Sequence, residues 1–520
     1  MNISDVASFR ILGVLSITFA IAFVAICIPA GIYSANEIDF ALPLATLLAV
    51  ALPWAALAAV LLSIPFAMRN RTLLRLLAAA WFALAVSVWV SASFLVFDVG
   101  VLDGRTQIDV PASQQILSAI VLLATASLSA LAAFRVQRRA LVAIACLTLA
   151  QLGGSLFHLA TVSPRGARTA EADPATVAEL FRLSDQKNVL VVVLDTFQST
   201  LFEDYLEKNP SIREDLAGFT FYRDTTGSAP TTYASMPPIH SGVKFDPERS
   251  LKATYQELVR SGSFVAQLAR SGYHASLVHA VIGVCPEGAL CVEDYQVSDG
   301  VGRATFSYLS LLDVSLLRAA PARVKGWIYN DGAWRARLLT DNARTLTRPI
   351  RHQRFLKRFG DSVHVAGTSP TIKFIHLMTT HPPIEMSDAC APLAEPLPFS
   401  RANFGLPATC SINTVRHLLD RLKSLGVYDA SFIAVIADHG ASLRPNPESN
   451  RIAGAAMPLL LVKPAFAQGP MKISDKPAEI RDLAATVCKE TGDCRSLDGI
   501  PLDELPESRQ RSYFHYVWRN

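Results

Sequence analysis

The hydrophobic positions of this chain are concentrated in its first third. Five stretches there each run for 20 or more residues without an aspartate, glutamate, lysine or arginine: residues 11–33, 41–68, 76–97, 115–134 and 140–162. A helix needs about 20 apolar residues to cross a bilayer. We therefore predict a domain of five transmembrane helices over residues 1–162, and favour this over five buried core helices.

The charges between these stretches predict their orientation. Two loops are mainly acidic, and Arg105 is their one basic residue. The other flanks are basic, with Arg10, Arg69, Arg71, Arg75, Arg135, Arg138 and Arg139. Because basic loops stay in the cytoplasm, we expect a cytoplasmic N-terminus and place everything after the fifth stretch outside. We expect the first stretch to be retained and not cleaved as a signal peptide.

Composition narrows the class of protein. Hydrophobic residues make up 51% of the 520 residues and charged residues 18%, which excludes a disordered chain. The net charge of +4 is too small to indicate nucleic-acid binding. A membrane protein with a soluble part remains.

The soluble part reads as one α/β domain over residues 188–520, after a linker at 163–187. Apolar runs alternate with amphipathic helices at 254–271 and 411–425, as in parallel sheets. Residues 305–328 are apolar and basic, and we expect a helix that lies either on the membrane surface or in the core. The predicted strands are 189–194, 275–279, 372–378, 432–437 and 457–462.

The cysteines agree with an outer location. Two of the eight fall within the apolar stretches, and the other six form three sequence-local pairs. In an oxidising compartment such pairs predict disulfides, and buried free thiols are the alternative. The favoured pairs are Cys285/Cys291, Cys390/Cys410 and Cys488/Cys494.

Polar residues follow two of the predicted strands. Asp195 ends the strand at 189–194, and the strand at 432–437 leads into Asp438 and His439. In open α/β sheets ligands bind at the carboxyl ends of the strands. Two carboxylates and an imidazole there suit a divalent cation.

A third segment, residues 228–242, is rich in hydroxyl groups and small residues. Pro237 and Pro238 favour a loop or a first helical turn. Hydroxyls just before a helix face the positive end of its dipole, where a phosphate is stabilised. Without the other two motifs, a capping turn would explain this segment equally well.

Together the three segments resemble the alkaline phosphatase/sulfatase superfamily. The layout is similar to its membrane-anchored, sulfatase-like branch: phosphoethanolamine transferases, lipoteichoic acid synthases and PbgA-type inner-membrane proteins. The resemblance implies a multi-pass protein of the bacterial inner membrane whose α/β domain is periplasmic. It also implies transfer of a phospho-head group from a membrane lipid donor to an envelope glycan or lipid. A hydrolase (phosphodiesterase) and a non-catalytic, lipid-sensing regulator are the alternatives.

Position by position, the resemblance implies that Asp195, Thr232, Asp438 and His439 bind the metal. Thr232 matches the nucleophile, because it stands ten residues before Gly242 and five before Pro237. His381 resembles a substrate-binding histidine. The further candidates for substrate contact are His376, which could equally be a core residue, His240 and Lys244.

The chain also departs from the family. In the segment Thr232–Met236 a threonine stands where the sulfatase motif has its nucleophilic cysteine or serine, and the arginine of that motif is missing, which disfavours sulfate-ester hydrolysis. Arg451 stands where the transferases have a second histidine, so a second zinc is disfavoured and an anionic substrate contact is favoured. Three oxygens and one nitrogen suit zinc or manganese, and suit calcium or magnesium less well.

Overall fold

The computed structural model describes residues 3–36, 40, 42–97, 99, 102, 108–161, 174–279, 281–292, 303–339, 347–445, 451–495 and 497–515. The chain divides into two compact units. The helical unit combines residues 1–169 with residues 301–343, and the α/β unit combines residues 170–300 with residues 344–520.

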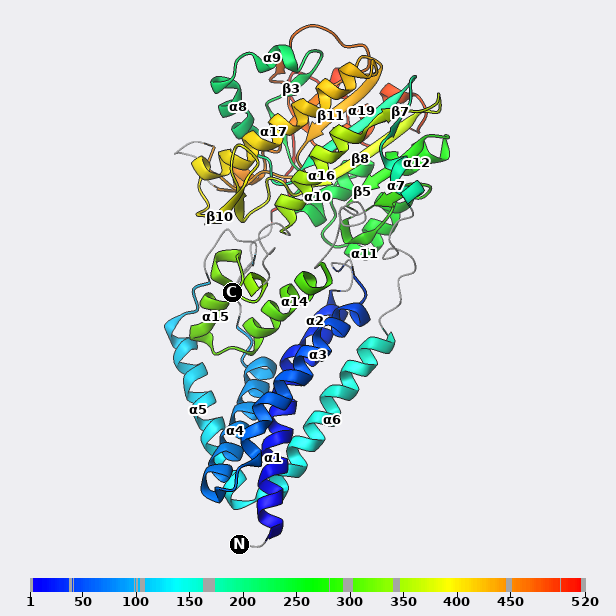
Figure 1. Cartoon of the computed structure of the whole chain (residues 1–520). Helices are drawn as coiled ribbons and strands as arrows, with labels where there is room; N and C mark the ends of the chain where they lie inside the picture. The colour runs from blue at the N-terminus through cyan, green and yellow to red at the C-terminus, as the bar shows by residue number, and fades with distance from the viewer. Residues whose placement is uncertain are drawn as a thin grey trace. The chain divides into compact units, whose positions relative to one another are not determined.

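Five helices of the helical unit are long and apolar enough to cross a membrane, as the sequence predicts (Figure 1). The first candidate span, Val6–Ala35, runs through α1 (Ile3–Ala22), the π-helical turn η1 (Phe23–Cys27) and α2 (Ile28–Ala35). The others are α3 (Leu44–Ser63) with η3 (Ile64–Ala67), α4 (Arg71–Phe94), α5 (Ala112–Arg135) and α6 (Gln137–Thr161).

The spans expose large apolar side chains as well as burying them. Leu123 and Leu149 are 68% and 71% exposed, which suits a surface that faces lipid. Inside the bundle, Gly13 of α1 lets Phe66 pack closely, because a Cβ atom there would lie 2.0 Å from the Phe66 ring. Shape, and not only hydrophobicity, therefore fixes how these helices meet.

A segment from the middle of the sequence belongs to the helical unit. Residues 303–339 form α14 (Arg303–Ala319), η6 (Ala322–Val324), α15 (Lys325–Tyr329), η7 (Asn330–Gly332) and η8 (Arg337–Leu339). Tyr308 and Leu311 of α14 are buried against residues of α2 and α3, and the Tyr308 hydroxyl donates to Ala25 O at 3.0 Å. The expected helix at 305–328 is thus buried on one face and interrupted at Pro321, and it does not fold within the α/β unit.

The α/β unit is built on an eight-stranded sheet of order β13-β3-β12-β11-β2-β8-β5-β6 (Figure 1). The strands β11, β2, β8, β5 and β6 pair in parallel, and β12 runs antiparallel to both neighbours. The bounds are β2 (Asn188–Leu194), β3 (Thr220–Tyr222), β5 (His274–Val278), β6 (Leu290–Val292), β8 (Thr371–Leu377), β11 (Ser431–Ile436), β12 (Leu460–Lys463) and β13 (Lys472–Ser474). The predicted, mostly parallel central sheet is confirmed.

Both faces of the sheet are buried, so β2 and β11 are apolar after their first residue, whereas β8 also carries the buried Lys373 and His376. Leu190 and Val192 of β2 pack into a core that includes residues of α8 (Ser199–Lys208), α16 (Arg348–Ser362) and α17 (Arg401–Ser424). On the other face, Phe374 of β8 contacts His240 of α10 (Thr232–Ser241) and Phe264 of α12 (Phe264–Arg270). The sheet is therefore a middle layer between two layers of helices.

Several element predictions need correction. The helix expected at 254–271 is divided at Gly262 into the π-helix η4 (Tyr255–Ser261) and α12, with a separate Ser263 N-cap. The strand expected at 457–462 begins later, at Leu460. In the predicted linker, residues 163–173 lie outside the described residues, but α7 (Pro174–Leu180) and β1 (Arg182–Leu183) are folded, with Leu180 and Leu183 buried in the core.

The remaining elements complete the α/β unit: β4 (Thr225–Thr226), α9 (Ile212–Asp215), α11 (Leu251–Thr254), η5 (Val281–Gly283), β7 (His364–Val365), β9 (Ile384–Met386), β10 (Pro392–Leu397), α18 (Arg451–Ala455), β14 (Ala478–Glu479), α19 (Asp482–Thr491) and η10 (Leu502–Glu504). The six cysteines of this unit form the three favoured disulfides, Cys285–Cys291, Cys390–Cys410 and Cys488–Cys494. Burial as free thiols is thereby excluded for them.

Candidate metal and nucleophile site

The sheet order brings the two predicted carboxylates together. The strands β2 and β11 are parallel neighbours, so their carboxyl ends lie at the same edge of the sheet. Asp195 directly follows β2, and Asp438 stands two residues after the end of β11. Both are fully buried. Residues that are distant in sequence thus meet because their strands pair in register.

Asp195, Asp438 and His439 form a compact ligand group. One ligand atom from each residue lies within 4.8 Å of the others. The Nε2 of His439 is 3.9 Å from Asp195 Oδ1 and 3.5 Å from Asp438 Oδ2. Its Nδ1 is 2.9 Å from the carbonyl oxygen of Gly440, which can only accept, so Nδ1 carries the proton and Nε2 offers its lone pair.

The hydrogen bonds of Asp438 fit a cation site. Its Oδ1 accepts backbone N–H groups from Thr196 at 3.0 Å and from His439 at 2.9 Å. Its Oδ2 is buried and accepts no hydrogen bond from any residue that the structure describes. A buried carboxylate oxygen without a donor is costly, whereas a bound divalent cation satisfies it. The three residues therefore suit a metal ion.

Gly440 is required by the backbone around this group. A Cβ atom at this position would lie 2.0 Å from Gly454 O, and one at Gly454 would lie 1.9 Å from Leu443 O. The Gly440 N–H donates to Ala455 O at 2.9 Å. In the Asp-His-Gly sequence, packing thus requires the glycine, and the first two residues are the candidate metal ligands.

Asp195 is the centre of a hydrogen-bond network. Its Oδ2 accepts the Thr232 hydroxyl and the His376 Nε2–H, both at 3.0 Å, and its Oδ1 accepts the Thr196 hydroxyl at 2.6 Å. Burial would raise the pKa of Asp195, but the hydrogen bond from His376 and the nearby imidazoles of His381, His376 and His439 outweigh it and lower that pKa. Asp195 is therefore held as a carboxylate.

Thr232 is the first residue of α10, and Thr231 is its N-cap. The N–H groups of the first helical turn point toward this end, where an anion is stabilised. Pro237 and Pro238 lie inside the helix, so the prediction of a loop or first turn for them is wrong. Both prolines lack an N–H, but their carbonyl oxygens still accept hydrogen bonds. Pro237 O accepts from the Ser241 hydroxyl and Pro238 O accepts from the Gly242 N–H, both at 2.8 Å, so the helix continues to Ser241.

The residues predicted to contact substrate differ in how far they are exposed to solvent. His381 is half-buried after β8, close enough to lower the pKa of Asp195. His240 is buried between Phe264 and Phe374, away from the surface where a substrate could reach it, and burial lowers its pKa to about 3. Lys244 is exposed after the end of α10. The side chain of Arg451 lies outside the described residues, although its backbone begins α18.

Sequence reasoning missed Thr196. Its hydroxyl donates to Asp195 and its N–H donates to Asp438, so it joins the two carboxylates. Its backbone has φ of 67°, which is rare for a β-branched residue and costs on the order of 1–3 kcal/mol. The available signal was its position directly after Asp195. A hydroxyl there could have been tested as a partner of the carboxylates.

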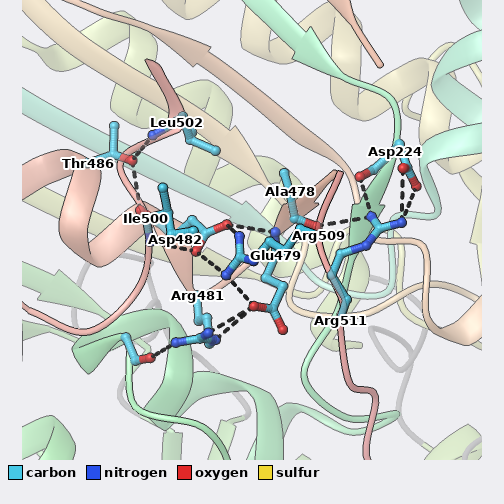
Figure 2. Close-up of polar contacts among 11 residues, drawn as sticks. Asp224, Ala478, Glu479, Arg481, Asp482, Thr486, Ile500, Leu502, Arg509 and Arg511 are labelled. Atoms are coloured by element: carbon cyan, nitrogen blue, oxygen red, sulfur yellow. Dashed lines mark hydrogen bonds and ion pairs between the residues drawn. The ribbon is translucent and has the colours of Figure 1, made fainter. Parts of the chain in front are cut away.

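Residues before and after α10 contact the C-terminal region, and Figure 2 shows the polar network around Arg481 and Arg509 in that region. After α10, Gly242 is left-handed with φ of 77°, and its carbonyl oxygen accepts from Arg481 at 2.8 Å. Before α10, Ser228 O accepts the Phe514 N–H at 3.1 Å. Between these points, Arg509 binds the buried carboxylates of Glu479 and Asp482.

Solved structures that are similar to this chain were found, although no family or curated protein was. No family model matches the chain, and no curated protein matches it. Solved structures similar to it include a protein in the alkaline phosphatase superfamily from Vibrio parahaemolyticus. That likeness has a TM-score of 0.40 at 14% identity, over 62% of this chain and 70% of the other.

Two further similar structures are a phosphonate monoester hydrolase and a lipoteichoic acid synthase. A phosphonate monoester hydrolase from Silicibacter pomeroyi is 15% identical, with a TM-score of 0.38 over 62% of this chain and 78% of that one. The lipoteichoic acid synthase LtaP from Listeria monocytogenes is 12% identical, with a TM-score of 0.35 over 60% and 74%.

Proposed function

We propose that the protein is a membrane-anchored, metal-dependent enzyme that transfers a phospho-head group through Thr232. The observation that carries the proposal is the hydrogen bond from the Thr232 hydroxyl to Asp195, inside a group whose Asp438 Oδ2 is buried without a donor. A hydroxyl at a helix N-terminus beside a cation site is an arrangement that suits phosphoryl transfer.

The residues that would hold the cation are Asp195, Asp438, His439 and Thr232. When bound there, a divalent cation lowers the pKa of a hydroxyl and so supplies a nucleophile at neutral pH. Zinc or manganese suits three oxygens and one nitrogen best, with calcium or magnesium next. The lowered pKa of Asp195 makes it a poor base, so its role toward Thr232 is to orient the hydroxyl.

The chemistry then rests on residues around Thr232. The Thr232 hydroxyl gives up its proton to solvent, and its oxygen attacks the phosphorus of a phosphodiester. The bond to the leaving alkoxide breaks, and the head group stays joined to Thr232 through a phosphodiester. The N–H groups at the start of α10 stabilise the negative charge on the phosphoryl oxygens. His381 is near enough to Asp195 to lower the pKa of that carboxyl, and it is the group that would stabilise or protonate the leaving oxygen. The hydroxyl of an acceptor then displaces the threonine.

The membrane spans suggest the substrates. Five candidate spans suit a donor lipid that is drawn from the surrounding bilayer. We propose an envelope glycan or lipid as the acceptor. Basic loops on one side of the spans place the N-terminus in the cytoplasm, so the α/β unit would be periplasmic and the protein would lie in the bacterial inner membrane.

The test is intact-protein mass spectrometry of the wild type and of Thr232→Ala and Thr232→Ser, each purified from native membranes and incubated with mixed phospholipids. We expect a head-group adduct on residue 232 in the wild type and none in Thr232→Ala. Thr232→Ser keeps a hydroxyl and is expected to form the adduct at a reduced rate. The mass of the adduct would identify the donor.

Turnover should follow the same order. Thr232→Ala is expected to abolish head-group release while the thermal unfolding temperature stays unchanged, since the side chain is half-buried at a helix start. Full activity in Thr232→Ala, or an adduct on another residue, would overturn the nucleophile assignment.

A further inference from the structure

The helical unit carries a cluster of exposed apolar side chains that lies outside its spans. In the inserted segment, Val324 and Trp327 are 39% and 63% exposed. The guanidinium groups of Arg318, Arg323 and Arg335 belong to the same stretch, and all three residues are exposed or half-exposed. These five residues are called the interfacial patch.

The patch lies at the level where two spans end. Arg318 Nε donates to Ala92 O at 3.0 Å, two residues before α4 ends at Phe94. The Ala322 N–H donates to the Ser118 hydroxyl at 3.3 Å, in the second turn of α5. At a rise of 1.5 Å per residue, Ser118 is about 9 Å along the helix axis from the start of α5, so both contacts lie near the same end of the spans.

The patch also continues a surface that faces lipid. Around Ser118, the side chains of Ile116, Leu117 and Ile120 are 61%, 52% and 60% exposed on α5. In a membrane span such side chains contact acyl chains. The hydrogen bond between the buried Ala322 and the buried Ser118 places η6 beside these first two turns of α5.

Trp327 is held in an orientation that suits an interface. Arg335 stacks over its ring, with its Cζ atom 5.2 Å from the ring centroid, and Arg335 Nε donates to Trp327 O at 3.1 Å. The indole therefore presents an apolar body next to a fixed positive charge. Tryptophan is enriched at membrane–water boundaries for this combination of apolar ring and polar edge.

The charge of the segment is one-sided. Residues 318–339 contain five basic residues and one acidic residue, Asp331. Lys325 is turned inward, where its Nζ donates to Leu317 O. The Nε of Arg337 lies 3.9 Å from Oδ2 of the buried Asp313. The arginines of the patch remain at the surface, where anionic head groups are their complement.

We propose that the interfacial patch is a lipid-binding surface, in which Trp327 and Val324 enter the leaflet beside α4 and α5 and Arg318, Arg323 and Arg335 bind anionic phospholipid head groups. This surface is independent of the chemistry at Thr232. It gives the inserted segment a function beyond packing, namely selection of the lipids that surround one end of the spans.

The test is nitroxide labelling of the full chain in lipid nanodiscs. The free cysteines are Cys27, which is buried, and Cys146, which is exposed on α6, so labelled wild type gives a reference that faces lipid. In a Cys146→Ser background, Trp327→Cys reports on the patch. Phe466→Cys is the matched aqueous reference, since Phe466 is 70% exposed in the α/β unit. Collision rates with oxygen and with a water-soluble nickel chelate measure contact with lipid and water.

We expect the ratio of oxygen to nickel collisions at residue 327 to match residue 146 and to exceed residue 466 several-fold. The ratio should also be higher in phosphatidylglycerol than in phosphatidylcholine nanodiscs. Arg323→Gln with Arg335→Gln should remove that lipid dependence. Arg260→Gln with Arg270→Gln, which changes the charge equally in the α/β unit, should keep it.

Two results would overturn the proposal. One is a label at residue 327 as accessible to nickel as the label at residue 466. The other is a dependence on phosphatidylglycerol that is absent in the wild type or survives Arg323→Gln with Arg335→Gln. Neither depends on turnover, so both are distinguishable from failure of the proposed transferase activity.

Discussion

At the scale of single residues, Asp438 shows how the two oxygens of one carboxylate take different roles. Its Oδ1 accepts two backbone N–H groups and so ties the ends of β2 and β11 together. Its Oδ2 faces the ligand group without a donor among the described residues. One oxygen thus holds the site in shape, and the other is left for a cation.

This division predicts the effect of Asp438→Asn. The amide oxygen can keep both backbone hydrogen bonds, but an amide nitrogen in place of Oδ2 cannot bind a cation. We expect the affinity for zinc or manganese to fall by more than about tenfold, because even partners of metal ligands contribute that much. Metal content after dialysis, measured by mass spectrometry, checks this.

Asp475→Asn is the matched control, because Asp475 is an exposed carboxylate paired with Arg223. It makes the same chemical change away from the site and should leave the metal content unchanged. Equal metal content in Asp438→Asn and the wild type would contradict the assignment of Asp438 as a ligand.

At the scale of elements, α10 depends on residues close to the C-terminal end of the α/β unit. Arg481 contacts Gly242 after the helix, and Phe514 contacts Ser228 before it. Gly242 also has to be glycine, because a Cβ atom there would lie 1.7 Å from Asp498 O. The position of Thr232 thus depends on residues more than two hundred positions later in the sequence. Figure 2 shows the ion pairs of Arg481 and Arg509 with Glu479 and Asp482 in this later region.

The ion pairs of Figure 2 differ in burial, which predicts different effects. Arg509 is 9% exposed and binds Glu479 and Asp482, which are 5% and 0% exposed. Among the described residues, Arg509→Gln leaves the buried Asp482 without a cation and leaves Glu479 with Arg481 alone, so it should lower the free energy of unfolding by about 3–5 kcal/mol. Arg511 binds the half-exposed Asp224, so Arg511→Gln should cost less than about 1 kcal/mol.

Urea unfolding of the two variants measures this difference. Hydrogen exchange of the peptide over residues 228–242 should also rise in Arg509→Gln before global unfolding, because both ends of α10 are held by this network. Equal stability losses in the two variants would show that the burial of the pair does not control its contribution.

At the scale of the whole molecule, the chain builds its helical unit from two separate parts of the sequence. The inserted helix α14 covers apolar residues of α2 and α3 with Tyr308 and Leu311. In a chain without the spans, these side chains have no apolar partner. The boundary between membrane and soluble parts is therefore not a single point in the sequence.

This organisation predicts how truncated chains behave. Residues 174–520 expressed alone should aggregate, because α14 exposes the face that packs on the spans. Replacement of residues 303–339 by a Gly/Ser linker should give a monomer by size-exclusion chromatography. A monomeric, soluble chain that still contains residues 303–339 would contradict the packing of α14 as an essential partner of the spans.

Much of the fold was readable from local patterns. Spans and central strands are long apolar runs, and burial on both faces of a helix or sheet leaves no other composition available. The disulfides followed from close spacing within an oxidising compartment. The prolines of α10 and the break at Gly262 were misread, because tertiary contacts override the local preference of a short segment.

The sequence by itself determined which residues could form the site: Asp195, Asp438 and His439 end apolar strands, and Thr232 stands before glycine and proline at a recognisable spacing. Only the tertiary structure decided how they are used. The pairing of β2 with β11 joins the carboxylates, and burial turns His240 away from the surface while His376 and Thr196 contact Asp195. Side-chain neighbours across a sheet depend on strand order, which no local pattern encodes.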